Sequence, residues 1–203
     1  MTVASTAGRA NQKLRTRTAI VQAAAELSRT GREMTMSEVA KAALVSEATA
    51  YRYFPDLASL LTEAIAGQLP DPADALAPVA DLDDPVERVA AATEFLLRHV
   101  LSRQGAVRAL IAATITSPGQ PQGRPGLRFG LIDSALAPLD RTLGATDPAA
   151  LAQLKRDLSV VVSAEALFSL TDSSGLGAEE AIASVVHTAT TLTRAASAGA
   201  SAR

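Results

Sequence analysis

Residues 36–53 read MSEVAKAALVSEATAYRY, and their spacing is the most informative feature of the sequence. Thr35, just before it, and Glu38 have the spacing of a capping box, in which each side chain bonds the other residue's backbone N–H at the start of a helix. The pattern predicts a short helix over Met36–Ala43. After a three-residue turn, Ser46 is a suitable N-cap for a second helix over Glu47–Phe54. Two short helices joined by a tight turn are therefore expected.

Small and apolar residues recur where these two helices would touch, and they are Val39, Ala40, Ala43, Val45, Ala50 and Tyr53. Packing through these positions fits a helix-turn-helix, whose second helix enters the major groove of DNA. In that arrangement Glu47, Ala48, Thr49 and Arg52 face the groove and Tyr51 lies near the DNA backbone. A helical hairpin inside a larger bundle is the alternative interpretation.

The flanking sequence predicts two further helices. Apolar residues at helical spacing indicate a helix over Thr16–Thr30, which Gly31 ends. Pro55 stops the Glu47–Phe54 helix, and Asp56 caps a following one over Leu57–Leu69. Four short helices thus fit within the first 70 residues, with residues 1–13 as a flexible arm and residues 14–69 as the N-terminal domain.

Charge is distributed unevenly along the chain. The net formal charge is −2 at pH 7, but residues 1–69 sum to +2 and residues 70–203 to −4. The first 25 residues contain four basic side chains and no acidic one. Such an arm is either a solvated segment or an electrostatic tether to phosphates.

Composition favours an all-α protein. Alanine is abundant and aromatic residues make up only 3% of the chain, a balance that favours helices over strands. Because the chain has no cysteine, thiolate chemistry and Cys-ligated metal sites are excluded, and a cytoplasmic location fits. The sequence shows no transmembrane run or ordinary signal peptide, so we expect no membrane association.

The second domain is expected to span residues 70–203. Prolines and aspartates crowd into the boundary segment Pro70–Pro85, which predicts a loop or a short helix. Helices are predicted over 85–102, 105–116, 127–143, 147–171 and 178–196, with a mobile loop over Ser117–Gly126. The last two helices are apolar over more than one face, which indicates a subunit interface.

The block TAIVQAAAELSRTGREMTMSEVAKAALVSEATAYRYFPDLASLLTEAI, residues 18–65, resembles the DNA-binding domain of tetracycline-repressor (TetR) family transcriptional regulators. The shared marks are the helix ending near Gly31, the motif residues that follow it, and the leucine pair of the next helix. Those residues are Thr35, Val39, Ala40, Val45, Ser46, Thr49, Tyr51, Tyr53, Phe54, Leu60 and Leu61. The remaining chain fits the family in length and in its two long final helices.

The resemblance implies the following DNA contacts. Thr35 would cap its helix against a phosphate, and Thr49 with Glu47 and Ala48 would face bases. Tyr51 and Tyr53 would lie beside the sugar-phosphate strand. The residues expected to form the interface are Arg15, Arg17, Thr35, Ser46, Glu47, Ala48, Thr49, Tyr51, Arg52 and Tyr53. The partner would be a palindromic operator in double-stranded DNA, bound by a homodimer that pairs through its last two helices.

Three positions depart from the family pattern. Leu44 stands where the turn usually has glycine, which predicts strain of about 1 kcal/mol if φ is positive there. Leu57 replaces a usual lysine at the start of the fourth helix, so one phosphate contact would be missing. Glu47 replaces a commonly basic residue, and a carboxylate is favourable there only if it accepts from a cytosine amine.

The resemblance also implies a repressor released by a small molecule in the C-terminal domain. With few aromatic residues available, an aliphatic pocket for an apolar or amphipathic effector is expected, with the loop 117–126 as its gate. The predicted walls are Phe95, Leu96, Ile111, Phe129, Ile132 and Phe168, for which plain core packing is the alternative.

No enzyme or cofactor is indicated. His99 and His187 lie on different predicted helices without metal-ligand spacing, and each fits a structural role. Glu165 could orient a ligand, or pair with Arg128 or Lys155. The rival to a DNA-binding regulator is a helical ligand-binding or adaptor module without a DNA role.

Overall fold

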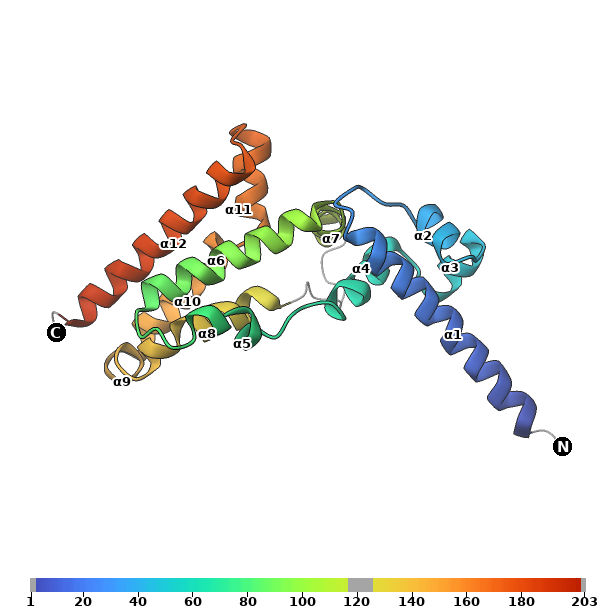
Figure 1. Cartoon of the computed structure of the whole chain (residues 1–203), viewed down its shortest axis with the longest axis horizontal. Coiled ribbons are helices and arrows are strands. Elements are labelled where there is room, and N and C mark those ends of the chain that lie inside the picture. Colours follow the sequence, from blue (N-terminus) through green and yellow to red (C-terminus); the bar gives the residue numbers. More distant parts are fainter. Residues whose placement is uncertain (1–2, 117–125, 202–203) are drawn as a thin grey trace. The chain divides into compact units, whose positions relative to one another are not determined.

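The computed structural model describes residues 3–116 and 126–201, and every regular element in these ranges is a helix (Figure 1). The all-α expectation is confirmed for this part of the chain. The elements in chain order are α1 Val3–Ser28, α2 Met36–Ala42, α3 Glu47–Tyr53, α4 Leu57–Ala66, α5 Pro72–Ala75, a 3-10 turn η1 Ala77–Val79, α6 Pro85–Ser102, α7 Gln104–Thr116, α8 Leu127–Asp140, α9 Leu143–Thr146, α10 Pro148–Val161, α11 Ala164–Phe168, a π-type turn η2 Ser169–Ser173 and α12 Ala178–Ser201. None of the described helices has both the length and the apolar character needed to cross a bilayer.

The chain divides into two compact units. The first contains α1 to α4 and also the segment from Leu101 through α7, while the second contains residues 70–100 and the chain from Gly126 onward. The boundary after Leu69 was expected. The predicted C-terminal domain of residues 70–203 nevertheless needs correction, because α7 packs on α1 and α4 and belongs to the first unit.

The core of the first unit is built from all of its helices. Fully buried side chains come from α1 (Ile20), α2 (Val39), α3 (Ala50) and α4 (Leu60 and Leu61). Ala106 and Leu110 of α7 join the same cluster. At the start of α7, a Cβ on Gly105 would lie 2.0 Å from the carbonyl oxygen of Arg32, so glycine is required for this close approach.

Helix α1 begins much earlier than predicted. It starts at Val3, so residues 3–13 are helical where a flexible arm was expected. Its first two turns extend past the rest of the unit in Figure 1. No proline precedes Pro55, and good helix formers such as Gln12, Lys13 and Leu14 occupy this stretch. These propensities allow the helix to continue toward the N-terminus.

The α2–α3 pair forms as predicted. The backbone N–H of Glu38 donates to Thr35 Oγ1 (3.2 Å) and the Thr35 N–H donates to the Glu38 carboxylate (2.8 Å), which confirms the capping box. The turn closes with bonds from the Val45 N–H to the Ala40 carbonyl and from the Leu44 N–H to the Lys41 carbonyl. These are the two bonds of a Schellman motif, which places its C′ residue in the left-handed region.

Leu44 occupies that C′ position with φ 57°, the one positive φ at a non-glycine residue in the described chain. Its side chain is 92% exposed and contributes little packing. Leucine therefore does not reshape the turn, which keeps its glycine-type geometry with a non-glycine residue at positive φ.

In the second unit, Arg88 compensates for a proline inside α8. Pro138 has no N–H, so the carbonyl of Ser134 four residues earlier loses its usual partner. The buried Arg88 guanidinium donates to that carbonyl (2.7 Å) and to the carbonyl of Ala135 (3.2 Å). It also donates to Val79 and Ala80 (2.9 Å each), and so ties η1 to α6 and α8.

The single helix predicted over 147–171 is wrong. Helix α10 ends at Val161, Val162 leaves the helical region with ψ 74°, and Ser163 caps α11 by accepting from the Ala166 N–H. The apolar pattern continues through this break, because Leu158 before it, Val162 at it and Leu167 after it are all buried. Glu165 lies 3.8 Å from Arg128, one of its two expected partners.

Candidate nucleic-acid interface

Helix α3 has one face buried against the core and an opposite face that is exposed and largely polar. Ala50 is fully buried against the core, and Tyr53 is half-buried beside it. The opposite face exposes Glu47, Ala48, Tyr51 and Arg52. Because residues four apart lie on one side of a helix, these side chains form one continuous surface.

The hydroxyl groups of Ser46 and Thr49 already take part in local hydrogen bonds. Ser46 caps α3 by accepting from the Thr49 N–H (3.2 Å), and the two hydroxyls lie 2.8 Å apart. Thr49 is half-buried. These bonds fix the first turn of α3, and a base contact by Thr49 would use the remaining capacity of its hydroxyl.

The helices beside α3 present fewer polar groups than expected. The Thr35 hydroxyl is exposed, but it already serves the capping box of α2. At the start of α4, Leu57 is half-buried and packs against the core, while Asp56 caps the helix by accepting from the Ser59 N–H (2.7 Å). Position 57 therefore offers an apolar core contact where the family pattern has a cation.

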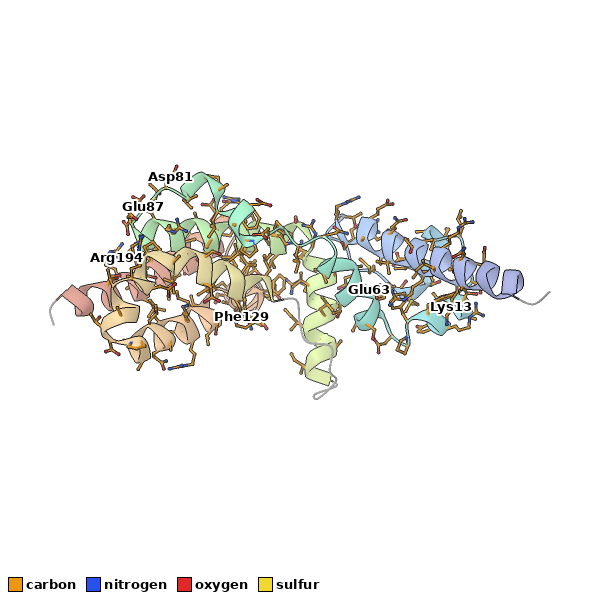
Figure 2. All side chains as sticks on the ribbon, turned by 90° about the horizontal axis from the view of Figure 1, so that it is seen from below. Lys13, Glu63, Asp81, Glu87, Phe129 and Arg194 are labelled. Atoms are coloured by element: carbon orange, nitrogen blue, oxygen red, sulfur yellow. The ribbon has the colours of Figure 1, made fainter. Side chains whose placement is uncertain are left out.

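The side chain of Arg17 is engaged by other residues of the first unit. Its guanidinium forms a two-bonded ion pair with Glu63 of α4 and lies 4.9 Å from the centre of the Phe54 ring. Figure 2 labels Glu63 on α4. These contacts hold α1 against α4 and give Arg17 a role within the fold, while its expected contact with DNA stays a prediction. Arg15, by contrast, is exposed on α1.

A cleft that sequence reasoning missed lies between α1 and α3. It has a volume of about 400 Å³ and is lined by Gln12 and Lys13 of α1 and by Arg52 and Tyr53 of α3. Lys13 is labelled on α1 in Figure 2. Lys13 precedes Arg17 by four residues and so shares its face of a helix. That spacing could have revealed the cleft if the helix had been predicted to begin before Thr16.

The structure does not bring the six predicted effector-pocket residues into one unit. Leu96, Ile132 and Phe168 are buried in the second unit, but Ile111 belongs to α7 of the first. Phe129 is half-exposed beneath the Arg128 guanidinium. Phe95 is half-buried and stacks on His99 at 6.2 Å. Of the predicted gate over 117–126, residues 117–125 lie outside the described residues, and Gly126 immediately precedes α8.

A second cleft, of about 540 Å³, lies in the second unit among α6, α8, α9 and α12. Its lining includes Pro138, Thr142 and Ser197, and Asp83 and Arg141 form an ion pair at its edge (3.5 Å). None of the six predicted pocket residues lines either of these clefts. In the described chain no cluster of three or more His, Asp or Glu side chains could hold a metal ion.

The comparisons with known proteins agree with this geometry. Residues 20–64, from the second half of α1 through most of α4, match the family model for bacterial regulatory proteins of the tetR family. This part of the chain is therefore similar to the N-terminal domain of tetR-family regulators. The tetR-family match begins after Lys13, so the α1 side of the cleft lies outside it.

No curated protein matches the chain. Among solved structures, a TetR transcriptional regulator from Rhodococcus sp. RHA1 is similar, with 22% sequence identity and a TM-score of 0.55. The alignment covers 89% of this chain and 97% of that one. The likeness therefore extends over both units, and at this identity it shows the tetR-type fold alone.

Proposed function

We propose that the chain is a sequence-specific transcriptional repressor that binds a palindromic operator as a homodimer. The observation that carries the proposal is the outer face of α3. Glu47, Ala48, Tyr51 and Arg52 are exposed there on a helix capped by Ser46 and seated through buried Ala50. This is the arrangement by which a helix-turn-helix places side chains in a major groove.

The decisive experiment is a gel shift with the DNA that flanks the chain's own gene. We expect a specific complex whose affinity falls by about a thousandfold or more between 50 and 200 mM salt, provided that the dimer contacts at least six phosphates. Tyr51→Ala should weaken it about tenfold, because a contact near the sugar-phosphate strand is worth on the order of 1.4 kcal/mol.

Arg141→Ala, an exposed substitution in the second unit outside α10 to α12, is the matched control and should bind like the unchanged protein. If the full chain forms no sequence-specific complex, the DNA-binding proposal fails and the rival module without a DNA role replaces it.

Dimerisation through α10 to α12 is part of the same proposal. Val160 on α10 is 73% exposed, as an apolar residue would be at a surface that a second copy covers. A two-fold dimer would place its α3 helices about one or more DNA turns apart, roughly 34 to 36 Å per turn. Sedimentation that gives a monomer at micromolar concentration would contradict it.

Release by a small apolar or amphipathic effector in the second unit completes the proposal. It rests on the family resemblance, and Ile111 is no longer among its candidate walls. An effector that favours a conformation unable to bind DNA would lower operator affinity by its differential affinity for the two states. Such a compound should raise the melting temperature and weaken the gel shift together.

A further inference from the structure

The cleft between α1 and α3 has an unusual charge balance. Lys13 and Arg52 bring two positive charges to its lining, and Gln12 and Tyr53 add an amide and a phenol that can donate hydrogen bonds. No carboxylate lines it among the described residues. Two like charges on one concave surface repel each other, so an anion placed between them would be stabilised.

The side chains at the mouth of the cleft are supported by the fold. Arg52 lies with its guanidinium 5.6 Å from the centre of the Tyr53 ring, a cation–π contact that restricts where the charge can go. One turn along α1 from Lys13, Arg17 anchors the helix to Glu63 and Phe54. The two cations are therefore presented by elements held together in the same unit.

The position of the cleft indicates which anion would bind there. Arg52 belongs both to the cleft and to the exposed face of α3, so a duplex seated on that face would bring a phosphate strand to the cleft. Phosphate contacts fix the register of a protein on DNA, whereas base-edge contacts carry the sequence information.

We propose that Lys13 and Arg52 together clamp one phosphate strand of the operator, and that base reading is left to Glu47, Ala48 and Thr49. The inference rests on the proposed function and deepens it. It adds Lys13 of α1 to the expected interface residues, and it moves Arg52 from the base-reading set to the phosphate-binding set.

The test measures the affinity of the full-length protein for operator DNA and for a scrambled duplex at several salt concentrations. The variants are Lys13→Ala, Arg52→Ala and the double substitution. Each single substitution should weaken both duplexes by the same factor, about tenfold, and lower the slope of log affinity against log salt by about one per protomer. The ratio of operator to scrambled affinity should stay unchanged.

The matched control is Arg29→Ala, which removes an exposed cation just after the C-terminal end of α1 and should leave the slope unchanged. Thermal melting of every variant verifies that the first unit stays folded.

Three results would overturn the clamp. Lys13→Ala could behave like Arg29→Ala, which would remove Lys13 from the interface. Arg52→Ala could alter the preferred base at one operator position, which would return Arg52 to base reading. Scrambled DNA could keep its affinity for the double variant while the operator loses it. If the unchanged protein binds no DNA, the proposed function fails instead, and the two failures are thereby distinguishable.

Discussion

Leu44 carries the backbone strain of the helix-turn-helix. A non-glycine residue in the left-handed region costs about 1 to 2 kcal/mol, and the exposed side chain of Leu44 returns little of it by packing. Leu44→Gly removes this strain but frees the unfolded chain, which costs about 0.5 to 1 kcal/mol. We expect a net gain of about 0.5 to 1 kcal/mol in the free energy of unfolding, measured by urea denaturation.

Leu44→Ala separates strain from side-chain loss. Alanine keeps the Cβ that is unfavourable at this φ, so the stability of this variant should stay within about 0.5 kcal/mol of the original. A glycine variant that is no more stable than the alanine variant would show that the turn stores no strain at Leu44.

Residue by residue, the sequence predicted what depends on near neighbours. The capping box and the turn position of Leu44 follow from spacings of a few residues, and both are found. Arg17 could not be assigned in this way, because its partner Glu63 lies 46 residues away in the chain. Only the packing of α1 on α4 brings the two side chains together.

At the scale of elements, α8 depends on Arg88 for hydrogen bonds that Pro138 cannot make. Arg88→Met would remove the donor from the buried or partly buried carbonyls of Val79, Ser134 and Ala135, at about 1 to 3 kcal/mol for each group left unsatisfied. We therefore expect a loss of about 3 kcal/mol in the free energy of unfolding. Arg141→Met, which removes a cation from an exposed ion pair of the same unit, should cost less than about 1 kcal/mol.

A double-mutant cycle attributes part of this cost to the proline. In a Pro138→Ala background, the Ser134 carbonyl regains a backbone donor, so Arg88→Met should cost about 1 kcal/mol less than it does in the original chain. An equal cost in both backgrounds would mean that Arg88 acts only through η1 and the loop after it.

The prediction of helix boundaries was wrong where a polar side chain interrupts a helix that the apolar pattern would continue. The hydrophobic period over 147–171 fits one helix, but Ser163 offers the backbone a cap and starts a new one. A serine side chain can hydrogen-bond to nearby backbone groups and so compete with the helix. The hydrophobic pattern alone does not tell a serine that caps a helix from one inside it. At the N-terminus the reverse occurred: the basic segment before Thr16 contains no proline, and α1 continues through it, Gly8 included, from Val3.

At the scale of the whole molecule, the sequence located the first division of the chain but not the return of α7. The proline-rich segment after Leu69 marks the boundary locally. Nothing local indicates that residues from Leu101 onward pack on α1 and α4, because such contacts join segments far apart in sequence. The α1–α3 cleft was missed for a related reason, since it needs both the full length of α1 and its placement beside α3.

A substitution at Leu110 tests whether the first unit depends on α7 for its stability. The Leu110 side chain is 5% exposed in the same core as Ile20 and Leu61, so Leu110→Ala should destabilise this unit by about 2 to 4 kcal/mol. Ile115→Ala, on the same helix but 68% exposed, should change stability by less than about 0.5 kcal/mol.

Hydrogen exchange read by mass spectrometry resolves where the loss occurs, because local opening free energies differ between cooperative units. Leu110→Ala should speed exchange in α1 and α4 as well as in α7, and should leave α8 and α10 unchanged, since those helices belong to the other unit. Faster exchange confined to α7 would show that the first four helices are stable without it, and the domain would then end at Leu69 as the sequence suggested. Faster exchange in α8 and α10 as well would show that the two units unfold as one.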